Sequence, residues 1–156
     1  EVQLEHEDGG EPLGRIEITG GKLQGTEILK EEVPNLIDEV PILAVAGALA
    51  EGVMTIRNAA ELRVKETDRI ETTIRNLRLM GGEIKEFEDG MVITGGRTLK
   101  GAKLESYGDH RIAMACAVAA LKANGVVEIE DADAINKSYP HFFNDLSYLS
   151  AEVDYK

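Results

Sequence analysis

Two short segments of the sequence concentrate charged side chains of the kinds that hold anions and move protons. The first runs from Glu61 to Arg69 and reads Glu-Leu-Arg-Val-Lys-Glu-Thr-Asp-Arg. We predict Lys65 and Arg69 on one face of a helix that starts here, where like charges four residues apart repel unless an anion lies between them. Glu66 stands beside both cations. An ordinary ion network on a solvated surface is the alternative interpretation of this segment.

The second segment contains the triplet Asp109-His110-Arg111, which is expected at the start of a helix. A helix N-terminus is electropositive and offers free N–H groups, so an arginine there is unfavourable unless it shares an anion with them. Arg111 therefore either helps to hold a phosphate or carboxylate or pairs with Asp109 or another acid, and the sequence leaves both interpretations open. Asp38 is expected at the start of the counterpart helix, and Lys137 at nearly the position of the first segment's cations.

An internal repeat places these segments in the fold. Residues 18–25 match residues 93–101, with one extra residue in the second copy. Residues 48–56 match 120–129, and the offset is 73 both from Gly52 to Gly125 and from Ile56 to Ile129. The first nine residues also resemble residues 83–90. A fixed period of this kind is the signature of a repeated supersecondary unit.

The complete unit is predicted to have the order βαβαββ, which makes the fold class α/β (α+β). Hydrophobic periodicity, glycines and prolines give its elements: a strand at 24–29, a helix at 35–51, a strand at 53–57, a helix at 66–80, and a hairpin at 83–87 and 91–94. The expected organisation is a closing hairpin of a preceding unit at 1–20, a complete unit at 21–96 and most of a final unit at 97–156.

Composition excludes several classes of function. The 156 residues carry 17 basic and 29 acidic side chains, a net charge of −12, which disfavours nucleic acid or an acidic membrane surface as a partner. The longest apolar run, 40–50, is short of the ~20 residues that span a bilayer. The lone Cys116 has no disulfide partner, which with no secretion signal favours the cytoplasm. The histidines, His6, His110 and His141, form no metal-ligand pattern. Because the chain begins on Glu1, we expect it to be a piece of a longer polypeptide.

The charged segments carry a family resemblance. Residues 62–69 and 107–114 resemble the two signature motifs of the 3-phosphoshikimate 1-carboxyvinyltransferases, also called 5-enolpyruvylshikimate-3-phosphate (EPSP) synthases. Residues 37–41 and 137–143 are similar to two further segments of that family, in the same order. The resemblance implies an enolpyruvyl transferase fold of the inside-out α/β barrel type, with six βαβαββ units in two domains. The chain would hold about two of the six units, as part of the C-terminal domain.

The resemblance also implies a reaction. The family transfers the enolpyruvyl group of phosphoenolpyruvate to the 5-hydroxyl of shikimate 3-phosphate and releases phosphate, in aromatic amino acid biosynthesis. By resemblance, Asp38 binds and deprotonates the hydroxyl, and Glu66 is the acid and base at the methylene carbon. His110 is expected either to assist proton transfer or to position the loop. No metal and no organic cofactor are implied.

The resemblance assigns the cations to substrate binding. Lys65 is expected near the substrate hydroxyl, where it also orders the two carboxylates, and Arg69 and Arg111 are expected to grip phosphoenolpyruvate. Lys137 is expected to meet the phosphate as a point charge. Together these four cations should converge on one rim of a cleft. Glu61 departs from the family pattern, because many members carry an amide there that touches the shikimate ligand.

The implied partners are the two substrates and the missing N-terminal domain of the same polypeptide, which carries most shikimate 3-phosphate contacts. Half a cleft cannot fix both reactants, so the isolated chain is predicted to be inactive, and the full enzyme to be monomeric. No nucleic acid and no membrane partner are expected. Two alternatives stay open: an enolpyruvyl transferase acting on UDP-N-acetylglucosamine, and a non-catalytic repeat module that binds an anion or a protein.

Overall fold

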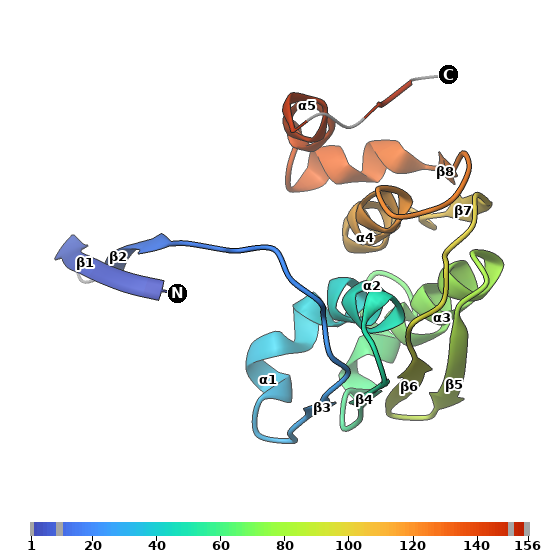
Figure 1. Ribbon diagram of the computed structural model, residues 1–156, viewed down its shortest axis with the longest axis horizontal. Coiled ribbons are helices and arrows are strands. Elements are labelled where there is room, and N and C mark those ends of the chain that lie inside the picture. Colours follow the sequence, from blue (N-terminus) through green and yellow to red (C-terminus); the bar gives the residue numbers. More distant parts are fainter. Residues whose placement is uncertain (1, 9–10, 150–151, 155–156) are drawn as a thin grey trace.

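The computed structural model describes residues 2–8, 11–149 and 152–154. One complete unit follows the predicted order βαβαββ. Its elements are β3 (Glu27–Ile28), α1 (Val33–Leu36), the 3₁₀ turn η1 (Ile37–Glu39), α2 (Val40–Leu49), β4 (Val53–Ile56), the 3₁₀ turn η2 (Ala60–Val64), α3 (Arg69–Leu79), β5 (Glu83–Phe87) and β6 (Gly90–Thr94). The strands form one sheet in the order β3-β4-β6-β5 (Figure 1). In that sheet β3 and β4 are parallel, and β6 runs antiparallel to both β4 and β5.

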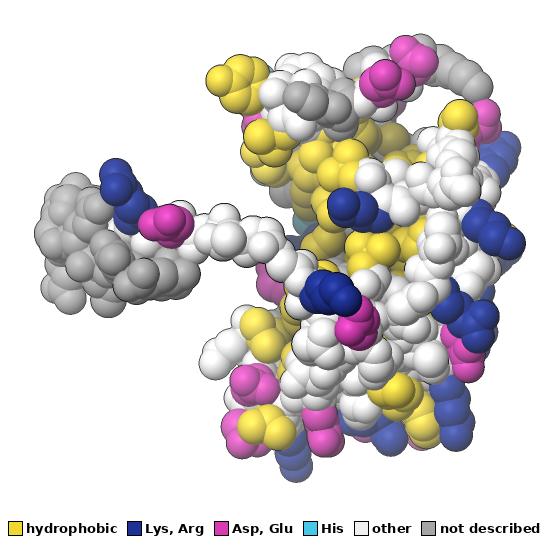
Figure 2. Space-filling model, viewed as in Figure 1, with side chains coloured by type: hydrophobic (Ala, Val, Ile, Leu, Met, Phe, Trp, Pro, Cys, Tyr) yellow, Lys and Arg dark blue, Asp and Glu magenta, His cyan; other side chains and the backbone are white. Residues whose placement is uncertain are grey.

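The second unit repeats the βαβα part of this pattern. It contains β7 (Lys103–Glu105), α4 (His110–Ala120), β8 (Glu128–Glu130), the 3₁₀ turn η3 (Ala132–Lys137) and α5 (Phe142–Tyr148). As β3 pairs with β4, so β7 pairs in parallel with β8. Hydrophobic side chains are visible at the surface of this half of the body (Figure 2).

The predicted repeat is visible in single hydrogen bonds. Gly25 N–H donates to the Glu51 carbonyl at 2.7 Å, and Gly101 N–H donates to the Asn124 carbonyl at 3.0 Å. A Cβ on Gly25 would lie 2.4 Å from the Val53 carbonyl oxygen, and one on Gly101 would lie 2.4 Å from that of Val126. At each of these two chain crossings, Gly25 beside Val53 and Gly101 beside Val126, the backbones lie so close together that only glycine fits.

A hairpin precedes the complete unit. It consists of β1 (Val2–Asp8) and β2 (Glu11–Ile16), which pair antiparallel and stand apart from the body in Figure 1. Its assignment to a preceding unit, like the predicted unit boundaries at 1–20, 21–96 and 97–156, stays a prediction.

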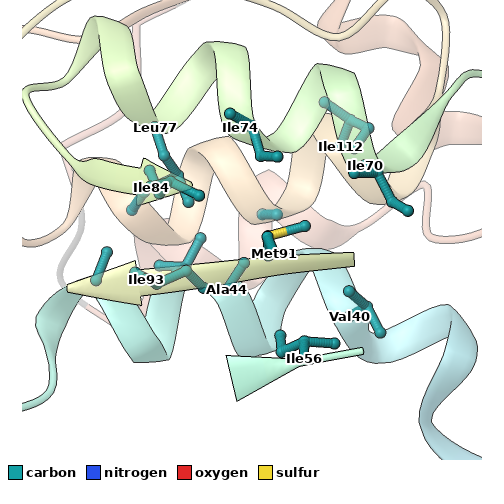
Figure 3. Packing of buried hydrophobic residues seen from close by; sticks show 14 of the residues in the cluster. Val40, Ala44, Ile56, Ile70, Ile74, Leu77, Ile84, Met91, Ile93 and Ile112 are labelled. Atoms are coloured by element: carbon teal, nitrogen blue, oxygen red, sulfur yellow. The ribbon is translucent and has the colours of Figure 1, made fainter. Parts of the chain in front are cut away.

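The core lies between the sheet and two layers of helix. Ile70, Ile74 and Leu77 of α3 face the sheet residues Ile84, Met91 and Ile93, as Figure 3 shows. The helical spacing of the three α3 residues predicted this face. On the same face of the sheet α2, which is apolar along its whole length, packs against α3, β4 and β6, and it also contacts α4. A helix that is apolar all round has to be buried, and this burial fixes the starts of α2 and α4 near each other.

Two predicted helices differ from the structure, and both differences matter for the charged residues. The helix expected over 35–51 is interrupted: α1 contains Pro34, α2 contains Pro41 at its first turn, and the 3₁₀ turn η1 lies between them. Proline lacks an N–H and clashes with the preceding turn, so each proline starts a new helix. The result places Asp38 in the short turn that leads into α2.

The helix expected over 66–80 begins only at Arg69. The Asp68 carboxylate accepts a hydrogen bond from Glu71 N–H at 3.0 Å and caps the helix there. Lys65 and Glu66 therefore lie in the loop between η2 and α3, and the prediction that Lys65 shares a helix face with Arg69 is wrong. The helix start predicted at Asp109-His110-Arg111 is confirmed, with Asp109 as the cap.

Helix length bears on a membrane role. The helices α3 and α4 have 11 residues each, about 16 Å of helix. Within the described ranges, none of the helices combines the length and the apolar character that crossing a bilayer requires.

Candidate active site

Asp38 is the meeting point of three chain segments. Arg69 Nη1 donates to Asp38 Oδ1 at 2.9 Å, and Lys65 Nζ lies 3.9 Å from the same oxygen. Arg111 Nη2 lies 3.7 Å from Asp38 Oδ2. Lys65 and Arg69 come from the first charged segment and Arg111 from the second. The carboxylate of Asp38 therefore lies beside both cations of the first segment, and an ion network was the alternative interpretation of that segment.

Arg69 is the buried centre of the charge network. Its side chain is 2% exposed, and its three nitrogens bond three carboxylates: Nε to Asp109 Oδ2 at 2.8 Å, Nη1 to Asp38, and Nη2 to Glu66 Oε2 at 2.6 Å. Burial alone would lower the pKa of this guanidinium, but the bonds and charges of Asp109, Glu66 and Asp38 raise it. Arg69 is thus a permanent cation that orients both carboxylates expected to act on protons.

Asp109 anchors the opposite side of that network. Its side chain is fully buried, and it accepts hydrogen bonds from Arg69, from Arg111 N–H at 2.9 Å and from Thr67 Oγ1 at 3.2 Å. Burial would raise the pKa of this carboxyl, but the bond and charge of Arg69 and the other two donors hold it below its usual value. The charge of Asp109 therefore persists in the interior, where it caps α4 and ties that helix to α3.

Arg111 extends from α4 toward the start of α2. Its Nη1 donates to Glu39 Oε1 at 2.8 Å and to the Asp38 carbonyl at 3.1 Å. Of the two interpretations left open by the sequence, pairing with an acid is present: Arg111 is hydrogen-bonded to Glu39 and lies 3.7 Å from the Asp38 carboxylate. The Asp109 carboxylate bonds the backbone N–H of Arg111 instead. A role for Arg111 in holding a substrate anion stays a prediction.

Lys65 has a carboxylate partner of its own. Its Nζ donates to Glu61 Oε1 at 2.5 Å, and this hydrogen bond is the main reason that the pKa of Lys65 is raised; burial opposes the rise slightly and Asp38 adds to it. Glu61 is one turn back in η2. The residue that departs from the family pattern is therefore the direct partner of a predicted substrate-binding cation.

Arg63 is a positioning residue whose contacts sequence reasoning missed. It donates to the Glu88 and Phe87 carbonyls at 2.7 Å each, to Asp68 Oδ2 at 2.7 Å and to Glu86 Oε1 at 3.0 Å. These bonds fasten the loop that carries Lys65 and Glu66 to the β5–β6 hairpin. The only local signal was its place inside the charged segment, because its hairpin partners lie 23 to 25 residues further along the chain.

The two remaining predicted residues lie at the same end of α4. His110 is the first residue of that helix and is partly exposed. Lys137, at the end of η3, donates to the Gly108 carbonyl at 2.9 Å, next to Asp109. The structure thus joins Asp38, Lys65, Glu66, Arg69 and Arg111 in one bonded network. Lys137 is connected to this network only indirectly, through its hydrogen bond to the Gly108 carbonyl next to Asp109.

Exposure separates the residues that a ligand can reach from those that it cannot. The side chains of Asp38 and Glu66 are 43% and 49% exposed, whereas Arg69 and Asp109 are buried. Half-exposed carboxylates held by a fixed cation can accept or donate a proton on a bound ligand. Across the described part of the chain, no cluster of three or more His, Cys, Asp or Glu side chains could hold a metal ion.

Comparison with known proteins decides the family. The family model for EPSP synthase (3-phosphoshikimate 1-carboxyvinyltransferase) matches residues 10–146. The chain belongs to the EPSP synthase family. This membership confirms the family that the motifs at 62–69 and 107–114 indicated.

Curated relatives carry the same family name. A 3-phosphoshikimate 1-carboxyvinyltransferase of Akkermansia muciniphila is 61% identical over 147 residues, which is 94% of this chain and 34% of that protein. One of Desulforamulus reducens is 49% identical over 152 residues, 97% of this chain and 35% of that protein. The chain therefore spans about a third of the length of the EPSP synthases that it matches.

Solved structures agree with the fold. The EPSP synthase of Acinetobacter baumannii superimposes with a TM-score of 0.91 at 37% identity, over 95% of this chain and 35% of that one. The enolpyruvyl transferase NikO of Streptomyces tendae gives a TM-score of 0.70 at 21% identity over 99% of this chain, a likeness of fold alone. The predicted fold class, part of an enolpyruvyl transferase domain, is thereby confirmed.

Proposed function

We propose that this chain supplies one side of the active site of a 3-phosphoshikimate 1-carboxyvinyltransferase. The reaction moves the enolpyruvyl group of phosphoenolpyruvate to the 5-hydroxyl of shikimate 3-phosphate and releases phosphate. The observation that carries the proposal is the convergence on Asp38 of Lys65, Arg69 and Arg111, which come from both signature segments. The names of the curated relatives support the same reaction.

The two half-exposed carboxylates do the proton chemistry. In the addition step, the substrate hydroxyl oxygen bonds to C2 of phosphoenolpyruvate, Asp38 takes the hydroxyl proton, and Glu66 gives a proton to the methylene carbon. In the elimination step, Glu66 removes a proton from that carbon while the C2–O bond to phosphate breaks. Arg69 bonds both carboxylates, which supports this division of labour because one fixed cation sets their relative position.

The accessible cations hold the anionic groups. Arg111, at the start of α4, and Lys137, at the end of η3, meet phosphoenolpyruvate, and Lys65 meets the hydroxyl region beside Asp38. Arg69 can grip the ligand directly only by giving up Asp38 or Glu66, because its side chain is 2% exposed. In the arrangement seen here Arg69 therefore acts as a positioning residue. His110, next to Arg111, assists proton transfer or positions this helix end.

The remainder of the site comes from outside this chain. The matching region is about a third of the curated relatives, so we propose that an N-terminal domain of the same polypeptide supplies most shikimate 3-phosphate contacts. The isolated chain is accordingly inactive, and the full enzyme is a monomer that works in the cytoplasm, where a lone cysteine needs no partner.

A chimera tests the proposal. In it, this chain replaces the matching third of the Akkermansia muciniphila relative, and phosphate release is measured with phosphoenolpyruvate and either shikimate 3-phosphate or UDP-N-acetylglucosamine. We expect turnover with shikimate 3-phosphate only, and none from the 156-residue chain alone. Turnover with UDP-N-acetylglucosamine would favour the alternative, an enolpyruvyl transferase that acts on that nucleotide sugar. A folded chimera without any turnover would favour the non-catalytic anion-binding module.

A further inference from the structure

Two exposed glutamates, Glu39 and Glu61, pair with cations of the candidate site but have no part in the proposed proton chemistry. Glu39 Oε1 accepts from Arg111 Nη1 at 2.8 Å, and Glu61 Oε1 accepts from Lys65 Nζ at 2.5 Å. Their side chains are 53% and 64% exposed, which sets them apart from the buried pair of Arg69 and Asp109. Each glutamate is thus free to swing away without opening the core.

The glutamates take the hydrogen bonds that a ligand would need. A phosphate or carboxylate bound by a guanidinium accepts parallel N–H bonds, and Nη1 of Arg111 is already used by Glu39 and the Asp38 carbonyl. One of the donors of Lys65 is used by Glu61. Lys65 and Arg111 lie 3.9 and 3.7 Å from opposite oxygens of Asp38, so both cations belong to the same end of the candidate site.

We propose that Glu39 and Glu61 are resident counter-ions, which an incoming phosphate or carboxylate displaces from Arg111 and Lys65. They hold the two cations in place in the absence of ligand, and they lower the affinity for anions. When a bound anion leaves, they reclaim the cations, which favours release of the phosphate product. The inference rests on the proposed function, because that function assigns phosphoenolpyruvate to Arg111 and the substrate hydroxyl region to Lys65.

Titration of the 156-residue chain with inorganic phosphate tests this idea. Isothermal calorimetry or amide chemical shifts would give Kd for the natural chain, Glu39→Gln, Glu61→Gln and the double variant. An exposed ion pair is worth little, so each single change should lower Kd by about 2- to 5-fold. Because each glutamate has a different cation, the two gains should multiply in the double variant.

Glu51→Gln is the matched control. Glu51 is also an exposed glutamate, at 58%, and it pairs with Lys22 at 3.0 Å. It lies past the far end of α2, about 15 Å of helix from η1 and beyond the Debye length of about 8 Å at 0.15 M salt. The control changes the net charge equally, so its Kd should match that of the natural chain. Urea unfolding would verify that all variants fold.

The outcomes separate this inference from the proposed function. Equal Kd values in the natural chain and the glutamine variants, an equal gain in Glu51→Gln, or no phosphate binding in any of the proteins would overturn it. Tighter binding in the site variants alone supports it. If the chimera lacks turnover while these variants bind phosphate more tightly, the proposed function fails and the counter-ion role stands. If the chimera is active while the Kd values are unchanged, the proposed function stands and the counter-ion role fails.

Discussion

Arg69 and Asp109 form a buried ion pair across the boundary between the two repeat units. The Nε and Oδ2 atoms lie 2.8 Å apart, and the two side chains are 2% and 0% exposed. A charge in the interior is tolerated only when it is paired and hydrogen-bonded. Arg69 meets this condition, because it also bonds the Asp38 and Glu66 carboxylates of the candidate site. The pair joins the start of α3 to the start of α4, so it fixes the two signature segments relative to each other.

Replacing Asp109 with asparagine should destabilise the chain strongly. The change leaves the buried Arg69 without its closest counter-charge, and removal of one partner from a buried pair typically costs 3–5 kcal/mol. Asp38 and Glu66 still bond Arg69, so we expect the lower end, about 3 kcal/mol, in urea unfolding. Glu130→Gln removes the exposed pair with Lys103 and should cost far less, because solvent screens an exposed ion pair. Equal losses would contradict the assignment.

Acid should weaken the fold through the same carboxyl. The folded-state pKa of Asp109 lies below its usual value of 3.8, because Arg69 and two further donors outweigh the effect of burial. A lowered pKa gives a stabilisation that is complete above the unfolded-state value and is lost as pH falls through the folded-state value. The difference in unfolding free energy between the natural chain and Asp109→Asn should therefore be constant near neutrality and shrink below about pH 4. A difference that stays constant into strong acid would refute this linkage.

The two glycine crossings should respond alike to an added methyl group. Gly25→Ala and Gly101→Ala each bring a Cβ to 2.4 Å from a carbonyl oxygen, so each should cost about 2 kcal/mol. Gly20→Ala, which meets no atom within 4 Å, should change stability by about 0.5 kcal/mol or less. Thermal or urea unfolding measures all three. A mild effect at Gly101 beside a large one at Gly25 would argue against equivalent crossings.

Cys116 should be inert while the chain is folded. Its side chain is 5% exposed, and burial raises the pKa of the thiol to about 12. Since the thiolate is the nucleophile, a disulfide reagent at pH 7 should react only as fast as the chain unfolds. Leu121→Cys in a Cys116→Ala background provides an exposed thiol for comparison, because Leu121 is 51% exposed. Comparable rates for the two thiols in the native state would contradict the burial of Cys116.

Local patterns in the sequence predicted much of the fold. The spacing of Ile70, Ile74 and Leu77 predicted the buried face of α3, and the repeat predicted a second, related unit, in which β7 pairs with β8 as β3 pairs with β4. The helix starts were harder, because one proline or one cap moves them by several residues. Pro41 and Asp68 shifted the starts of α2 and α3, and so moved Asp38, Lys65 and Glu66 into turns.

Long-range contacts in the site could not be predicted in the same way. The sequence indicated which residues were charged, but pairing depends on which helix starts meet in the folded chain. Arg111 pairs with Glu39, 72 residues away, and Arg69 with Asp109, 40 residues away. Nothing local distinguishes Glu39 from the other acidic residues of a chain with 29 of them. The burial of Arg69, which changes its expected role, follows from the same tertiary packing.

Glu66 is the acid and base at the methylene carbon in the proposed reaction, so its replacement should remove most of the turnover. Phosphate release from phosphoenolpyruvate and shikimate 3-phosphate is followed in the chimera with the natural Glu66, with Glu66→Gln and with the remote control Glu51→Gln. A missing acid–base group costs about 100-fold or more, so we predict that kcat falls by that factor in Glu66→Gln alone, with little change in KM. Undiminished kcat in a folded Glu66→Gln chimera would contradict the account.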